Sequence, residues 1–198
     1  MFKRRTSRPF YRALVEAAWP TMGWKRAFSY YWHRLQRIPG TPESIAAGFA
    51  CGAAASMMPL VGFHFLLSAL LAWLVRGSVL ASAFGTVVGN PWTFPFIWVG
   101  TYELGQLFLG TNQDLSGRKP FRTMFSGMAD ALRTFDGHLF MDQVWPIWWP
   151  MLAGSIPVAI ITGFGTYWLI VNPIRKVQHI RQRRAAARQA PSNPHTPS

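Results

Sequence analysis

Three long runs without a charged residue dominate the chain, at residues 44–75, 77–102 and 143–174. A stretch of about eighteen or more predominantly apolar residues is long enough to cross a bilayer as a helix. A soluble domain would have to bury all three runs with little polar surface left to cover them. The pattern therefore predicts an all-α, polytopic membrane protein.

Prolines interrupt the first two runs: Pro59 divides residues 44–75, and Pro91 and Pro95 divide residues 77–102. Each proline removes a backbone donor and crowds the carbonyl four residues before it, so neither run can form one regular helix. Each half measures about 21 Å as a helix, against an apolar bilayer core of about 30 Å. Two arrangements stay open: a re-entrant helical hairpin, or two halves stacked into one kinked crossing.

The two interrupted runs also resemble each other in composition. Small residues precede the proline in both, and bulky residues follow it. Interrupted segments at matching positions of two repeats are typical of transporters that bind a solute near the bilayer midplane. Within the first run, Gly48 and Gly52 lie four residues apart, and such a face lets another helix approach closely.

Basic amphipathic segments flank the apolar runs. Between residues 24 and 38, aromatic and aliphatic side chains recur at helical spacing, while Lys and Arg keep mostly to other faces. This pattern favours a helix lying in the membrane interface, with packing against the rest of the protein as the alternative. Thr41 should cap the next helix and Pro42 should begin it. A second surface helix is predicted at residues 118–136.

The net charge of +13 is concentrated at the two ends of the chain. Residues 1–43 and 175–198 are strongly basic, whereas residues 103–142 are nearly neutral, which predicts that both termini lie in the cytoplasm. An even number of crossings is then required, so at least one interrupted run must re-enter or contribute two crossings. Nucleic-acid binding is disfavoured because the cations flank apolar segments. Contacts with anionic lipid head groups are predicted for Arg4, Arg5, Arg8, Lys25, Arg26, Arg34, Arg37, Arg175 and Lys176.

Three regions follow from these patterns. Residues 1–40 form a basic amphipathic region, residues 41–175 form the membrane-embedded domain, and residues 176–198 are predicted to be a basic, largely disordered cytoplasmic tail.

Four stretches, 41–50, 58–62, 89–95 and 102–105, resemble a bacterial family of membrane proteins grouped as domain of unknown function twenty-sixty-two. The most specific part is the Asn-Pro-x-Thr pattern that begins at residue 90. One departure is the Gly-Ser pair at residues 77–78, where an asparagine is expected. The resemblance implies a small multi-helix protein of the bacterial inner membrane, and it implies no established reaction, ligand or cofactor.

The sequence shows no catalytic pattern. The five histidines lack metal-ligand spacing, the glycines form no phosphate-binding loop, and the serines lack a nucleophile motif. We therefore predict no enzyme activity, no metal and no cofactor. The single cysteine, Cys51, excludes an intrachain disulfide.

Four polar or ionisable side chains at apparent membrane depth are candidate site residues, because such groups are costly in lipid: His64, Asn90, Thr93 and Glu103. A structural alternative is open for three of them. Asn90 and Thr93 can cap the helix that restarts at Pro91, and Glu103 lies near the end of its segment and can reach the interface.

These features favour a membrane scaffold or accessory subunit that binds anionic lipid, a partner membrane protein or a second copy of itself. The alternative is a small-solute or ion transporter-like protein built on the broken helices around Pro59 and Pro91. A lipid-modifying enzyme is least favoured, because the sequence shows no recognisable nucleophile.

Overall fold

Every regular element in the described part of the chain is a helix, which confirms the all-α prediction. A computed structural model describes residues 24–60, 62–110, 126–127, 130, 133–134 and 137–189. Most of the surface helix predicted at residues 118–136, together with Arg4, Arg5 and Arg8, lies outside these residues. The elements are α2 (Trp24–Leu35), α3 (Pro42–Ala55), α4 (His64–Leu74), α5 (Val79–Gly85), the 3₁₀-helix η1 (Thr86–Val88), α6 (Phe94–Leu109), α8 (Gly137–Leu139), the π-helix η2 (Phe140–Val144) and α9 (Trp145–Gln189).

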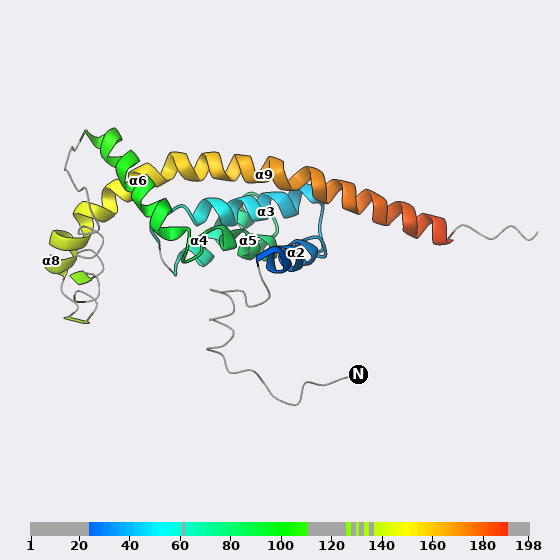
Figure 1. Cartoon of the computed structure of the whole chain (residues 1–198), viewed down its shortest axis with the longest axis horizontal. Helices are drawn as coiled ribbons and strands as arrows, with labels where there is room; N and C mark the ends of the chain where they lie inside the picture. Colours follow the sequence, from blue (N-terminus) through cyan, green and yellow to red (C-terminus); the bar gives the residue numbers. More distant parts are fainter. Residues whose placement is uncertain are drawn as a thin grey trace, which may run out of the picture.

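Helix α3 is the centre of the bundle, with α9 along one side and α4 and α5 along another (Figure 1). Thr41 caps it as predicted, because its Oγ1 accepts a hydrogen bond from the Ser44 amide at 3.2 Å. The main core joins the end of α2 to α3, α5 and α9. Its buried members are Leu35, Ile38, Ile45, Ala46, Ala81, Ile170, Val171 and Ile174.

The first interrupted run folds as a hairpin. After Pro59 the chain turns back, and α4 packs on α3. At the far end of α4, Ser44 Oγ donates to the carbonyl of Arg76 at 3.4 Å, and the Ser78 amide donates to the carbonyl of Ser44 at 2.8 Å. The end of α4 therefore returns to the level at which α3 began. The two halves of this run therefore lie antiparallel as a helical hairpin.

The second interrupted run is arranged differently. Helix α5 with η1 runs parallel to α3, and after the break at Pro91 the chain continues into α6, which packs on the first part of α9. The order helix, proline break, helix thus occurs twice, as the compositional repeat suggests. The second halves differ, because α4 folds back on α3 whereas α6 joins α9 (Figure 1).

Glycines bring α3 and α5 into direct backbone contact. A Cβ atom at Gly48 would lie 2.1 Å from the carbonyl oxygen of Ser78, and one at Gly52 would lie 2.0 Å from that of Ser82. From the other helix, a Cβ atom at Gly85 would lie 2.1 Å from the carbonyl oxygen of Phe49. The close-approach face predicted for Gly48 and Gly52 is therefore confirmed, and its partner is α5.

A second glycine contact joins α6 to α9. A Cβ atom at Gly105 would lie 1.8 Å from the carbonyl oxygen of Pro150, and one at Gly154 would lie 1.9 Å from that of Thr101. Sequence reasoning did not identify this pair, because the two glycines stand on segments far apart in the chain. The contact fixes the crossing of α6 over α9.

Helix α9 corrects the prediction of a largely disordered tail. It is continuous for 45 residues through Pro150, Pro157 and Pro173. Residues 176–189 are therefore helical, although they belong to the segment predicted to be disordered. Most residues of this stretch are Arg, Gln or Ala, which are good helix formers, and contacts with the α2–α3 loop hold its beginning. At 1.5 Å per residue the helix is about 68 Å long.

A left-handed residue ends α4. Arg76 has φ 56°, its amide donates to the carbonyl of Trp73 at 3.1 Å, and the amide of Gly77 donates to that of Ala72 at 2.7 Å. These two hydrogen bonds form a Schellman motif, whose left-handed position is usually occupied by glycine. An arginine there costs about 1–2 kcal/mol of backbone strain.

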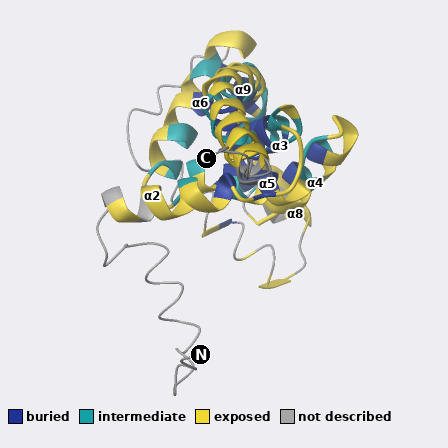
Figure 2. Ribbon diagram, turned by 90° about the vertical axis from the view of Figure 1, so that its right-hand side faces the viewer, coloured by how far each residue is buried: buried dark blue, intermediate teal, exposed yellow. Residues whose placement is uncertain are grey.

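Only α9, among the helices of the described residues, is both long and apolar enough to cross a membrane; α4 and the α5–η1 pair are apolar but shorter. Large apolar side chains nevertheless cover the outside of the bundle. Phe96 is 81% exposed and Trp73 is 71% exposed. Figure 2 shows exposed residues along the outer faces of α4, α6 and α9.

We expect Gly52→Ala to destabilise the fold by about 1–3 kcal/mol, because the added methyl group must push α5 away from α3. Thermal unfolding of the detergent-solubilised chain measures the change. The matched control is Gly165→Ala on α9, where a Cβ atom meets nothing within 4 Å. This control should be neutral or stabilising by about 0.5–1 kcal/mol. Equal stability of the two variants would contradict the backbone contact.

Candidate functional site

Asn90 and Thr93 form a reciprocal cap at the second proline break. Asn90 Oδ1 accepts hydrogen bonds from the amides of Trp92 at 2.9 Å and Thr93 at 3.1 Å. Thr93 Oγ1 accepts from the Asn90 amide at 2.9 Å and donates to the carbonyl of Val88 at 2.7 Å. The Asn-Pro-x-Thr pattern thus satisfies backbone groups that the break exposes. This is the structural alternative that the sequence left open for these two residues.

His64 stands at the first break, as the first residue of α4, and is buried. Its Nδ1 lies 3.3 Å from the carbonyl oxygen of Leu60. Its ring lies 4.4 Å from that of Phe65 and meets the ring of Phe94 edge-on at 6.1 Å. The contact between His64 and Phe94 therefore brings the two proline breaks together.

Aromatic residues complete this junction. Phe94 stacks on Trp98 with ring centres 5.4 Å apart, and Trp148 Nε1 of α9 donates to the carbonyl of Pro59 at 3.0 Å. The sequence does not assign Trp148 to this break, because Trp148 and Pro59 lie 89 residues apart in the chain. Glu103, the fourth candidate, is exposed on α6 more than two turns beyond Phe94. It does not belong to the same cluster.

Polar contacts at the opposite end of α3 form a clasp between α9 and the α2–α3 loop. Arg175 pairs with Glu43 at 2.7 Å, Gln178 Nε2 donates to the carbonyl of Gly40 at 3.0 Å, and an Arg181 guanidinium N–H donates to that of Gln36 at 2.7 Å. The hydrogen bond from Arg175 lowers the pKa of the Glu43 carboxyl below its ordinary value of 4.5. Arg175, predicted to contact lipid, thus has a protein partner.

Helix α2 carries cations on one side and packs into the core on another. Leu35, and Ile38 just after the helix, are buried in the main core, so packing against the protein is observed for this part of the segment. A groove of about 770 Å³ lies between the end of α2 and α5. Three cationic or titratable side chains and two apolar ones define its character: His33, Arg34, Arg37, Leu80 and Phe84.

Other predicted head-group contacts lie elsewhere on the surface. Arg26 on α2 and Lys176 on α9 are both exposed. The structure does not describe the side chain of Lys25.

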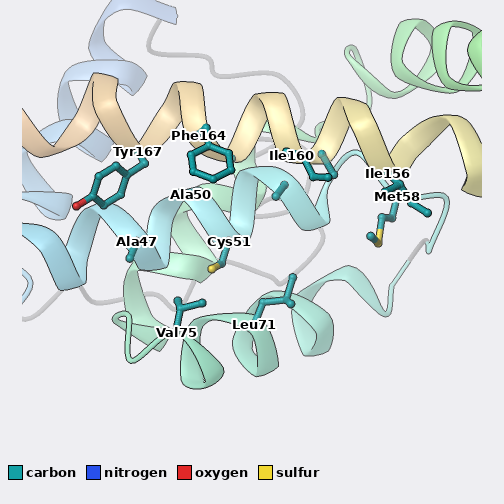
Figure 3. A pocket seen from close by; sticks show the side chains of 13 residues that line it. Ala47, Ala50, Cys51, Met58, Leu71, Val75, Ile156, Ile160, Phe164 and Tyr167 are labelled. Carbon is teal, nitrogen blue, oxygen red and sulfur yellow. The ribbon is translucent and has the colours of Figure 1, made fainter.

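An apolar groove of about 480 Å³ runs between α3, α4 and α9 (Figure 3). Small residues of α3 form its floor, and bulky residues of α9 and α4 form its walls. Cys51 lies inside it, and no charged side chain lines it. The groove suits hydrocarbon and offers no chemistry for a polar ligand. Within the described residues, no group of three or more His, Cys, Asp or Glu side chains is placed to hold a metal ion.

A family model described as "Uncharacterized protein conserved in bacteria (DUF2062)" matches residues 25–183. The chain belongs to this family. The resemblance stated from the sequence is therefore confirmed, and the match covers α2 through most of α9. No curated protein and no solved structure matches the chain. For this DUF2062 member, the family description names no reaction and no ligand.

Replacing Asn90 with Ala should destabilise the fold by about 0.5–2 kcal/mol, because two backbone amides lose their acceptor. Asn90→Asp keeps a carboxylate oxygen in the same position and should retain more of the stability. Thermal unfolding in detergent distinguishes the two variants. An Ala variant as stable as the unchanged chain would show that the cap has no structural role.

The Glu43–Arg175 pair should make stability depend on pH. Because the pKa of Glu43 is lowered in the folded state, its contribution is present above the unfolded pKa. It is lost as the pH falls through the folded pKa. The unchanged chain should therefore unfold at a higher temperature than Glu43→Gln at neutral pH, and the difference should vanish in acid. A difference that persists in acid would assign the effect to something other than ionisation.

Proposed function

We propose that this chain is an integral protein of the bacterial inner membrane that acts as a scaffold or accessory subunit, holding anionic lipid or a partner membrane protein. The observation that carries the proposal is the division of its surface. Large apolar side chains are exposed on α4, α6 and the first part of α9, whereas cations gather where α2 and the second part of α9 meet. Exposed apolar surface on this scale marks a lipid or protein contact.

The helix order supports a definite membrane arrangement. In this proposal α9 crosses the bilayer, and α3 with α4 forms a re-entrant hairpin that enters and leaves on the cytoplasmic side. Helices α5 and α6 form one broken crossing in the opposite direction to α9. Two crossings place both basic ends in the cytoplasm, as the distribution of positive charge favours. The hairpin is thus the feature that reconciles three apolar runs with an even number of crossings.

Short helices at membrane depth need partners for their broken backbone, since hydrocarbon supplies none. The Asn90–Thr93 cap and the hydrogen bond from Trp148 to Pro59 meet this need at the two proline breaks. The same contacts favour the scaffold over the transporter-like alternative. The polar atoms that a solute would contact are engaged with the protein's own backbone.

A scaffold role requires a surface for partners, and the apolar groove between α3, α4 and α9 has the chemistry for a lipid chain or an apolar helix. A second copy of the chain is one such partner. We propose no enzymatic reaction, because the candidate side chains His64, Asn90 and Thr93 are hydrogen-bonded to nearby backbone groups.

The experiment that tests the membrane proposal is a labelling map of single cysteines in a Cys51→Ala background. Arg37→Cys and Gln182→Cys should react with an impermeant reagent from the cytoplasmic side, and Asp142→Cys from the opposite side. All three side chains are exposed in the structure, so burial within the protein does not prevent labelling.

Reaction of all three positions from one side would contradict the crossing by α9. The hairpin is tested separately with Arg76→Cys, which should label from the same side as Arg37→Cys. Release of the chain from membranes by alkaline carbonate would refute the whole proposal, because an integral protein resists that treatment.

A further inference from the structure

A second, apolar groove adjoins the groove beside α2. The second groove, of about 350 Å³, is lined by residues of α2, α3, α5, η1 and α9, among them Val87, Val88 and Leu169. Phe84 lines both grooves, and its ring meets that of Tyr31 edge-on at 6.3 Å. The two grooves therefore adjoin at Phe84, and one is lined by cations whereas the other is apolar.

Along α5 the cationic groove comes before the apolar groove. A phospholipid in a bilayer has the same order from the membrane surface inward, with its head group first and its acyl chains after it. Leu80, at the start of α5, lines only the cationic groove. Phe84, near the end of α5, lines both grooves, and Val87 and Val88, one turn later in η1, line only the apolar one. Helix α5 starts beside Ser44, at the end of the bundle that carries the clasp. The cations therefore stand at the proposed cytoplasmic surface, and the apolar groove leads away from it toward the bilayer interior.

Charge complementarity identifies the head group. Arg34 and Arg37 are both exposed in the cationic groove, with His33 beside them. In the described part of the chain neither arginine is paired with a carboxylate, and Arg34 donates a hydrogen bond to the Tyr30 hydroxyl at 2.7 Å. Guanidinium groups bind phosphate oxygens strongly, because several N–H donors match their geometry.

We propose that these two grooves bind one anionic phospholipid, with its phosphate on Arg34 and Arg37 and one acyl chain passing Phe84 into the apolar groove. The proposal rests on the proposed membrane function and gives it a defined lipid site. A phosphate alone would leave the apolar groove empty, and a neutral lipid would leave the two guanidinium groups without a counter-charge.

The first test measures binding of fluorescent phosphatidylglycerol and phosphatidylcholine to the purified full-length chain in detergent. We expect phosphatidylglycerol to bind more tightly. The double variant Arg34→Gln, Arg37→Gln should lose about 30-fold in that affinity, at about 1 kcal/mol for each cation. The control Arg183→Gln, Arg184→Gln removes the same charge from the exposed end of α9 and should lose little.

The second test fills the apolar groove. Leu169 is 70% exposed and lines the groove, so Leu169→Trp can obstruct it without disturbing the core. This variant should bind phosphatidylglycerol at least about tenfold more weakly, a change of about 1.4 kcal/mol. Leu66→Trp, at a 69% exposed position of α4 outside both grooves, is the control and should bind normally. Circular dichroism checks that all variants remain helical.

The outcomes separate this inference from the proposed function. Equal losses in the two arginine pairs would show attraction to net charge alone and would overturn the site, while the membrane scaffold stands. Unchanged binding in Leu169→Trp, or full competition by inorganic phosphate, would overturn the acyl-chain position. Competition by an acidic peptide but not by lipid would assign the cations to a protein partner. A chain that shows no preference for phosphatidylglycerol would contradict the anionic-lipid part of the proposed function itself.

Discussion

The backbone contact between α3 and α5 is the constraint on which the bundle depends. Gly48 and Gly52 let the two helices touch along their length, and Gly85 extends the contact from the other side. In the proposed membrane environment, side-chain burial provides little drive for helices to associate, so close van der Waals packing would supply it. Small residues elsewhere on α3 admit α4 and α9 at the same time. A 14-residue helix thereby becomes the element that three others share.

Features determined by local chemistry were predictable from the sequence. The Thr41 cap, the interruption at Pro59 and the small-residue face of α3 each depend on side chains within a few positions of one another. The capping role of Asn90 and Thr93 is local in the same sense, because their partners lie within five residues. The hairpin form of the first run was one of two alternatives, since a proline permits both a return and a kink.

Features that join distant segments could not be predicted in this way. The glycine pair at Gly105 and Gly154, and the hydrogen bond from Arg181 to the carbonyl of Gln36, depend on how α6 and α2 meet α9. The helical extension of α9 past Pro173 was missed because proline usually ends a helix. The cationic groove could not be predicted from the sequence, for a similar reason. Arg34 and Arg37 were named from their position on α2, but Leu80 and Phe84 join them only through tertiary packing.

Helix α3 is attached to α9 at both of its ends. Glu43 meets Arg175 at one end, and just beyond the other end the carbonyl of Pro59 accepts a hydrogen bond from Trp148. Because these two contacts lie at opposite ends, neither helix can rotate about one of them without breaking the other. Sliding by a single turn would break both contacts at once, so α3 and α9 must tilt together as one body. Among the described helices, a change in the angle between α3 and α9 would therefore break a contact at one end or the other.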